Sequence, residues 1–396
     1  MNRQHGVERP LDVVLFGATG FVGSLTAACL AAHAPDGCRW ALAGRSLPKL
    51  ERLRERLAAA DPRCADLPLL TADADDADAL RELAGSTRVV ASTVGPYVHH
   101  GEKLVAACAE AGTDYTDLTG EPEFVDTMYL RHDTRARETG ARIVHACGFD
   151  SVPHDLGAYF TVRQLPEGVP LTVDGFVRAG AVFSGGTFAS ALTALGRGRQ
   201  AARAARERRL HEPRLVGRRA RAPQGSPHFS PATGTWALPL PTLDPRVVER
   251  SARALERYGP DFRYRHFASV KHLPVALGGT AALGVLAGAA QVPAVRDWLT
   301  GRYEAGSGPG EERRRRSWFT VRFVGEGGGR RVFTEVSGGD PGYDETAKML
   351  AQATLCLALD ELPATSGQVT TAVAMGDALL ERLRSAGIRF RVAATL

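Results

Sequence analysis

The sequence predicts an α/β protein: an N-terminal Rossmann domain with a doubly wound parallel sheet, an inserted α+β domain, and C-terminal helices returning to the first domain. Short apolar runs alternate with helical patterns through the first 150 residues, as repeated βα units with right-handed crossovers require. A glycine-rich segment also lies directly between the first predicted strand and the first predicted helix. After residue 150 the alternation weakens, which predicts a change of architecture there.

The predicted elements of the first domain, residues 1–150, follow one another in regular order. Strands are expected at 11–16, 40–43, 69–72, 88–94 and 142–146, and helices at 22–33, 48–60 and 101–112. Leu50, Leu53 and Leu57 recur at spacings of three and four, which indicates one buried face of the second helix. Gly112 is placed to end the third helix.

The second domain is expected at 151–345, with strands at 171–183 and 317–336 in a mixed or antiparallel sheet. Between these strands lies an arginine-rich stretch, 197–221, which we expect to be a loop. A segment rich in proline, serine and glycine follows at 222–245, and it is typical of a loop or flap.

Two further segments complete the chain. Residues 273–290 contain no charged side chain, which favours a buried helix, an acyl-chain surface or a lipid-docking surface. The last segment, 346–396, has a helical pattern, and we expect it to pack on the first domain.

Composition narrows the function classes. The chain has 396 residues and a net charge of +5, and arginine supplies almost all of its positively charged side chains. Its six cysteines are scattered and form no C-x-x-C pair or His/Cys cluster, which indicates a reducing cytoplasm and predicts no metal site. The N-terminus lacks the apolar region of a signal peptide. No aromatic pattern accompanies the arginines, so nucleic acid is not an expected partner.

The glycine-rich segment GATGFVG at 17–23 predicts a dinucleotide site. Gly17 allows the tight turn, Gly20 lets the backbone approach a pyrophosphate, and Gly23 permits close packing of helix and strand. The helix start exposes backbone N–H groups to the phosphates. We therefore assign cofactor binding to Gly17, Thr19, Gly20, Phe21 and Val22. The alternative is a glycine turn that binds no ligand.

The second strand ends without the carboxylate that an NAD enzyme uses for its ribose. Arg45 and Ser46 stand there instead, and a guanidinium with a hydroxyl can hold a 2′-phosphate. The expected cofactor is therefore NADP(H), although a solvated Arg45 would give the same pattern. Asp73, after the third strand, is placed to meet the adenine or to cap a helix.

The fourth strand ends in the segment TVGPY at 93–97. Open α/β sheets bind ligands at the carboxyl ends of their strands, so this segment is expected beside the nicotinamide. It contributes Thr93, Val94, Gly95 and Pro96 to the predicted cofactor site.

Several segments together resemble the saccharopine dehydrogenase-like oxidoreductases, and most closely their bacterial branch of trans-acting enoyl reductases. The matching segments are GATGFVG (17–23), LAGRS (42–46), TVGPY (93–97), AGTDYTDLTGE (111–121), ACGFDSVPHDL (146–156) and AMGDALLERL (374–383). The resemblance covers essentially the whole chain and is thin between about 197 and 315.

This resemblance implies an NADPH-dependent reduction of a carbon–carbon double bond in an acyl, polyketide or lipid intermediate. It also implies that the inserted domain supplies the substrate pocket and the contacts of a homodimer. Two alternatives stay open: an imine or amino-acid dehydrogenase of the saccharopine type, and a non-catalytic NADP-bound scaffold at a membrane.

No Tyr-x-x-x-Lys pair is present, so the proton donor must be sought elsewhere. Tyr97 and His99 follow the fourth strand and are the catalytic candidates, because a reduction needs a proton donor or a group that stabilises negative charge. A structural role for each is the alternative. The residues expected near the substrate are again Tyr97 and, in addition, Glu121, Cys147, Asp150 and Ser151.

Some of these candidates also have plain structural readings. Asp150 or Ser151 before Pro153 fits a helix N-cap, and Cys147 fits a small packing residue. The arginines of 197–221 and of the run 313–316 could attract an acidic acyl carrier protein or an anionic membrane, the latter giving peripheral attachment of a cytoplasmic protein.

Overall fold

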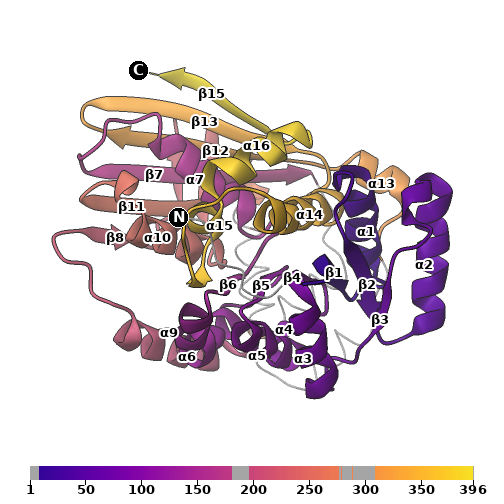
Figure 1. Ribbon diagram of the computed structural model, residues 1–396. Coiled ribbons are helices and arrows are strands. Elements are labelled where there is room, and N and C mark those ends of the chain that lie inside the picture. The colour runs from indigo at the N-terminus through magenta and orange to yellow at the C-terminus, as the bar shows by residue number, and fades with distance from the viewer. Residues whose placement is uncertain (1–8, 181–195, 276–277, 279–287, 289–307, 396) are drawn as a thin grey trace. The chain divides into compact units, whose positions relative to one another are not determined.

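The computed structural model describes residues 9–180, 196–275, 278, 288 and 308–395 (Figure 1). The chain divides into two compact units. The first unit comprises Met1–Gly148 and Tyr343–Arg382, and the second comprises Phe149–Gly342 and Leu383–Leu396. In sequence, the second unit is thus inserted into the first, and the last strand of the chain belongs to the second unit.

The described strands of the first unit form a seven-stranded sheet in which every neighbouring pair is parallel. The order is β14 (Gly367–Val369), β6 (Arg142–Val144), β5 (Asp114–Asp117), β4 (Thr87–Ser92), β1 (Leu11–Phe16), β2 (Trp40–Gly44), β3 (Leu69–Thr71). The strand order reverses between β1 and β4. In open α/β sheets, such a switch point marks the ligand crevice at the carboxyl ends of the strands.

Helices cover both faces of this sheet, which explains why its central strands are apolar throughout. On one face α1 (Phe21–His33) packs against α14 (Asp344–Leu359), and on the other lie α3 (Ala77–Ser86), α5 (Glu102–Ala111) and α6 (Pro122–Thr139) (Figure 1). The helix α2 (Leu47–Ala60) packs on β2 and β3 and buries Leu50, Leu53 and Leu57. Gly112 ends α5 with a φ of 70°.

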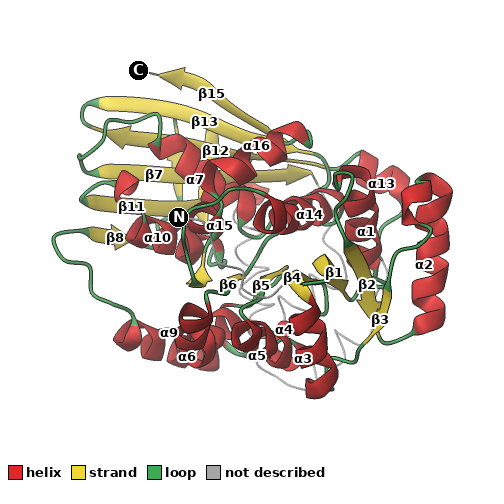
Figure 2. Cartoon of the chain, viewed as in Figure 1, coloured by secondary structure: helices red, strands yellow, loops and turns green. Residues whose placement is uncertain are grey.

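The second unit contains a mixed sheet, with α7 (Val152–Val162) and α10 (Asp244–Ala254) packed against it (Figure 2). The strand order is β15 (Arg389–Thr395), β13 (Arg330–Gly338), β12 (Trp318–Gly327), β7 (Leu171–Gly180), β11 (Asp261–Val270), β10 (Thr235–Pro239), β9 (His228–Ser230), and β8 (Arg219–Arg221) pairs with β11. β7 and β11 are parallel, whereas β12 runs antiparallel to both β7 and β13.

The structure confirms the predicted strands and helices of the first domain to within a few residues, and it corrects three predictions beyond it. Residues 198–211 of the arginine-rich stretch form the helix α9 (Gly198–His211) rather than a loop, because Ala204, Ala205 and Arg208 give it a buried face. The segment 222–245 contains the antiparallel strands β9 and β10.

The C-terminal segment also differs from the prediction, because it contains strands as well as helices. Besides α14, α15 (Thr371–Ala374) and α16 (Gly376–Ser385), it supplies β14 to the first sheet and β15 to the second. The apolar segment 273–290 lies outside the described residues except for 273–275, 278 and 288. No helix in the described part of the chain is long and apolar enough to cross a bilayer.

Candidate functional site

The glycine loop lies at the switch point of the first sheet, between β1 and α1. Gly17 has a φ of +83°, and a Cβ there would lie 2.7 Å from Val94 Cγ2 and 2.8 Å from Thr93 Oγ1. The amides of Gly17 and Ala18 both donate to the carbonyl of Ala43, at 2.9 and 3.1 Å. Only glycine fits the turn that carries the chain from β1 back to α1.

The other two glycines of the loop differ in what surrounds them. A Cβ on Gly23 would lie 2.2 Å from the carbonyl oxygen of Gly17, so the helix packs directly on the turn. A Cβ on Gly20 would meet nothing nearer than 3.4 Å. The fold therefore requires a glycine at 23 but leaves room at 20, as expected where a ligand, not the protein, occupies the space.

The start of α1 is suited to bind an anion. Gly20 is its N-cap and provides no side-chain hydrogen bond, so the first-turn amides of Val22 and Gly23 have neither an intrahelical acceptor nor a side-chain cap. Thr93 holds the end of β4 against this loop: its amide donates to Phe16 O at 3.0 Å, and its hydroxyl donates to Gly17 O at 3.0 Å.

Cations gather beside the loop at the end of β2. Arg45 is exposed and makes no ion pair with another described residue, and Ser46 is the N-cap of α2. A cavity of about 510 Å³ next to them is lined by Thr19, Lys49, Arg52, Glu55 and Arg56. These cations were not among the predicted site residues, although the spacing of Lys49, Arg52 and Arg56 places them on one face of α2.

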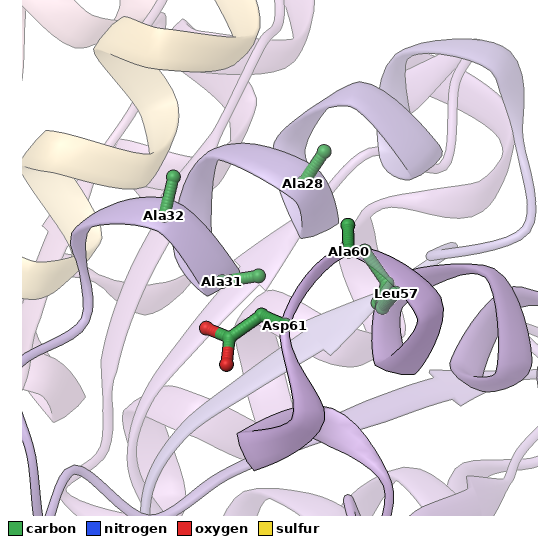
Figure 3. Close-up of a pocket in the computed structure, with 6 residues that line it drawn as sticks. All are labelled: Ala28, Ala31, Ala32, Leu57, Ala60 and Asp61. Carbon is green, nitrogen blue, oxygen red and sulfur yellow. The ribbon is translucent and has the colours of Figure 1, made fainter.

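A second cavity, of about 260 Å³, lies between the later turns of α1 and the end of α2 (Figure 3). Alanine methyl groups and a leucine form most of its wall, and its one charged group is Asp61, whose carboxylate accepts a hydrogen bond from the Arg63 amide. An apolar wall with a carboxylate is unsuited to a phosphate. The cavity at Thr19 suits a phosphate better, because three cations, Lys49, Arg52 and Arg56, line it beside the single carboxylate of Glu55.

Asp73 follows β3 and shapes a turn. Its Oδ1 accepts the amide of Asp75 at 2.9 Å, whereas the N-cap of α3 is Asp76, which accepts the amides of Asp78 and Ala79. Asp73 is thus not the helix cap of the alternative reading. Its role at the adenine stays a prediction.

The segment after β4 is held by hydrogen bonds to buried groups. The Gly95–Pro96 peptide is cis, and the short helix α4 (Tyr97–His100) follows it. The buried Tyr97 hydroxyl donates to Ser92 O at 3.0 Å and accepts from the Leu118 amide at 3.1 Å. Burial, followed by the charge of Asp117, raises the pKa of Tyr97 well above its usual value. The hydroxyl thus links the end of β4 to the residue that follows β5.

Glu121 fixes the start of α4 from the neighbouring loop. Its two carboxylate oxygens accept the amides of Tyr97 at 3.1 Å and Val98 at 2.8 Å. Burial raises the pKa of Glu121, although the two amide bonds act in the opposite direction. The next two histidines, His99 and His100, are exposed.

A buried aspartate–histidine pair lies at the same edge of the sheet; the sequence indicates Asp117 as a loop carboxylate, but not its pairing with His145. His145 Nδ1 is 2.7 Å from Asp117 Oδ2, and Asp117 Oδ1 accepts the amides of Thr119 and Ala146 at 3.1 and 2.9 Å. Ala146 has a φ of 59°, a strained left-handed conformation for a residue with a Cβ. Cys147 follows, fully buried, with its amide bonded to Asp117 O.

The remaining two candidates belong to the second unit. Ser151 is buried and is the N-cap of α7, with Pro153 in the first turn as predicted, but its side chain makes no capping hydrogen bond. Asp150 is exposed. Tyr97, Glu121 and Cys147 lie in the first unit.

Comparisons with known proteins agree with this geometry. Residues 13–144 match the saccharopine dehydrogenase NADP binding domain family. The chain is 37% identical over 413 residues to a trans-acting enoyl reductase of Mycobacterium tuberculosis, covering 96% of this chain and 97% of that protein. It is also 37% identical over 414 residues to the trans-acting enoyl reductase of Mycobacterium leprae, with the same coverage of both chains.

The fold has a solved counterpart. Apo saccharopine dehydrogenase (L-Glu forming) from Saccharomyces cerevisiae superposes with a TM-score of 0.58 at 12% identity, covering 96% of this chain and 99% of that one. The resemblance and the NADP(H) assignment made from the sequence are thus confirmed. The chain belongs to the trans-acting enoyl reductase family and is an NADP-dependent oxidoreductase with a saccharopine dehydrogenase-like fold.

Proposed function

We propose that this protein reduces a carbon–carbon double bond of an acyl, polyketide or lipid intermediate with NADPH. The observation that carries the proposal is the 37% identity, over nearly the full length of both chains, to proteins named trans-acting enoyl reductases. The absence of crowding at Gly20, where a Cβ would make only one ordinary contact, supports the cofactor assignment.

The geometry of the first unit supports the proposed cofactor residues. The loop Gly17–Val22, including Thr19, Gly20 and Phe21, is proposed to hold the pyrophosphate. Arg45 and Ser46 hold the 2′-phosphate. Lys49 and Arg52, which line the cavity at Thr19, add further positive charge.

The rest of the cofactor would lie along the strand ends. Asp73 is proposed at the adenine, and the segment Thr93, Val94, Gly95 and Pro96 at the nicotinamide, because it follows the strand at the switch point. Bound NADPH supplies a hydride, and the protein must bind, orient and protonate the substrate.

For protonation, His99 is the better of the two candidates. Its side chain is exposed at the edge of the sheet, whereas the Tyr97 proton is already donated to Ser92 O. We propose that Tyr97 and Glu121 position α4, and that His99 donates the proton. Cys147, Asp150 and Ser151 remain substrate-proximal predictions.

An acidic acyl carrier protein is the proposed macromolecular partner. The helix α9 exposes Arg199, Arg203, Arg206 and Arg209, of which Arg203 pairs with Glu207. By contrast, Arg315 and Arg316 of the second arginine run pair with Glu311 and Glu312. The helix α9 therefore offers more uncompensated positive charge to an acidic surface. A homodimer and peripheral membrane attachment remain predictions.

The test is a reductase assay with α,β-unsaturated acyl thioesters, presented free and on a carrier protein. With NADPH deuterated at nicotinamide C4, the product should gain one deuterium and one solvent proton. An imine of an amino-dicarboxylate serves as the competing substrate. Reduction of the imine alone would contradict the enoyl proposal and favour the saccharopine-type alternative. If no substrate oxidises bound NADPH, the scaffold alternative stands.

A matched pair of variants tests the proton donor. His99→Gln should lower kcat about 100-fold, the lower end of a general-acid contribution. His100→Gln removes the adjacent exposed histidine and should leave kcat nearly unchanged. Equal rates for the two variants would remove His99 from the proposed mechanism.

A further inference from the structure

Three buried ionisable side chains from distant parts of the sequence converge in the second unit. His154 lies in the first turn of α7, Asp244 begins α10, and His266 lies on β11. His154 Nε2 is 3.7 Å from Asp244 Oδ1, and His266 Nε2 is 3.5 Å from Asp244 Oδ2. All three residues are buried, with exposed fractions of 2%, 4% and 4%.

Both separations are too long for a normal hydrogen bond. Within the described residues, the atoms Asp244 Oδ1 and His154 Nδ1 have no hydrogen-bond partner, although the side chains of Thr242 and Ser151 interact with the Asp244 carboxyl group and act to lower its pKa. A buried carboxylate oxygen without a donor is costly, so a further group bound at Asp244 Oδ1 would stabilise the cluster.

The two histidine–carboxylate separations are close to those between the ligands of a metal ion. Zinc binds histidine nitrogen and carboxylate oxygen at about 2.0–2.2 Å, so tetrahedral ligand atoms lie about 3.3–3.5 Å apart. One ligand atom from each of the three side chains lies within 4.8 Å of the others. The two measured pairs involve different oxygens of the Asp244 carboxylate and are within a few tenths of an ångström of this spacing. The widest separation, up to 4.8 Å, must shorten by more than 1 Å before all three side chains can hold one ion.

The surroundings orient the ligand atoms. The hydroxyl of Tyr264 is 2.9 Å from His266 Nδ1, and this contact directs His266 Nε2 toward Asp244. Tyr264 is itself fixed, because it is fully buried and a Cβ on Gly175 would lie 2.4 Å from its hydroxyl. The His154 ring packs edge-on against His266, with centroids 4.8 Å apart.

The charges of the cluster are also compatible with a cation. Burial lowers the pKa of His266 to about 3, and burial with the nearby His266 lowers that of His154, so both imidazoles are neutral and can offer a lone pair. Burial, and more weakly the charge of Asp150, raises the pKa of Asp244. A divalent ion would reverse this penalty by stabilising the ionised carboxylate.

We propose that His154, Asp244 and His266 form a binding site for a divalent transition metal, of which zinc is the best match, with a water molecule as the fourth ligand. The site ties α7 and α10 to β11, and its burial gives it a stabilising role within the second unit. Zinc carries no electrons and none of the proposed cofactor residues belongs to the site, although two of the substrate-proximal candidates, Asp150 and Ser151, interact with Asp244.

The experiment uses the full-length, untagged protein, stripped with a chelator and then given zinc chloride alone. We expect one tightly held zinc ion per chain by mass spectrometry after gel filtration. At a zinc activity of about 100 times Kd, the melting temperature should rise by about 5–10 °C over the stripped protein. Cobalt(II) in place of zinc should give the intense visible absorption of a tetrahedral site.

Variants assign the site to these residues. His266→Gln should lose the bound zinc and the zinc-dependent rise in melting temperature, and His211→Gln, at an exposed histidine of α9, should retain both. Tyr264→Phe keeps all three ligands and frees His266 Nδ1, so it should weaken zinc binding about 10–100-fold in a folded protein.

Two results would overturn the proposal. The first result is a wild-type protein that retains less than a tenth of a zinc ion per chain and whose melting temperature does not change when zinc is added. This result would show that the cluster binds no zinc. This outcome does not depend on whether any variant folds. Retention of zinc by His266→Gln would place the metal elsewhere. Neither outcome bears on the reductase proposal, because no activity is measured.

Discussion

Replacing Gly20 or Gly23 by alanine adds one methyl group to the loop, and the two variants are expected to affect cofactor binding and folding differently. Gly20 is in an extended conformation, with φ −70° and ψ 169°, and an added Cβ lies 3.4 Å from its nearest neighbour. Gly20→Ala should therefore fold, at a cost of about 1 kcal/mol for a poorer N-cap, or about 2–4 °C in melting temperature. At Gly23 the same methyl lies 2.2 Å from Gly17 O, more than 1 Å inside contact distance.

The backbone at Gly17 cannot easily yield to this contact, because its amide is bonded to Ala43 O at 2.9 Å. Gly23→Ala should consequently lower the free energy of unfolding by about 1–3 kcal/mol or more. This is the net loss after the roughly 1 kcal/mol that alanine gains over glycine in helix propensity. Thermal melting followed by circular dichroism measures this difference between the two variants.

Cofactor affinity should follow the opposite order. Titration with NADPH, followed by calorimetry at fixed salt, should show that Gly20→Ala raises Kd at least tenfold, equivalent to about 1.4 kcal/mol. Gly20→Val should abolish binding, since its larger side chain fills the space proposed for the pyrophosphate. Wild-type affinity in a folded Gly20→Val protein would show that the phosphates bind elsewhere, and the assignment of the loop would fail.

Three further predictions test the 2′-phosphate contact, the loop anchor and a buried carboxylate. Arg45→Ala should raise the Kd of NADPH by tens of fold, about 2–3 kcal/mol, with little effect on NADH, and an equal loss for both cofactors in calorimetry would contradict the assignment. Thr93→Val removes the hydroxyl bond to Gly17 O and should lower the melting temperature by about 2–4 °C; no change would show that the bond is dispensable. Burial alone would raise the pKa of Glu335, but hydrogen bonds from Arg322 and Arg391 outweigh it and leave the pKa below its usual value. The ionised Glu335 therefore stabilises the fold above the pKa of the unfolded state, and this stabilisation is lost as the pH falls through the pKa of the folded state. Glu335→Gln should lower the melting temperature by about 2–4 °C at pH 7 and by less in acid. A difference that stays constant with pH would refute this reasoning.

The first sheet could be predicted from the sequence because its strands are buried on both faces. Such strands appear as continuous apolar runs, and Val13, Val14, Val89 and Val90 are all fully buried. The glycine loop was equally accessible, since every residue that defines it lies within a seven-residue segment. In both cases the structural cause is local in sequence.

The second unit was harder to predict because its structure depends on contacts between distant residues. β13 pairs with β15, more than fifty residues later, and no pattern within either strand indicates this partner. The helix α9 is so rich in arginine that its narrow buried face, with Ala204 and Ala205, gives little apolar periodicity. The cluster of His154, Asp244 and His266 likewise has no recognisable spacing along the chain.

The missed aspartate–histidine pair shows the same limit within the first unit, and it also shows what structure adds to a motif. Thr116 pairs with Val144 in the parallel ladder of β5 and β6, so the next residues, Asp117 and His145, emerge side by side where the strands end. Asp117 lies in the segment 111–121, but nothing in that segment indicates His145, and only the strand register relates the two residues.

Local conflicts with ordinary folding preferences gather at this one edge of the first sheet. Ala146 has a positive φ, Asp117 and His145 are buried polar groups, and the Glu121 carboxylate is buried to hold two amides of α4. Each of these features costs folding free energy. Such costs concentrate at sites where function requires a fixed geometry. Because the same edge carries the switch point between β1 and β4, fold topology and local strain independently indicate one site.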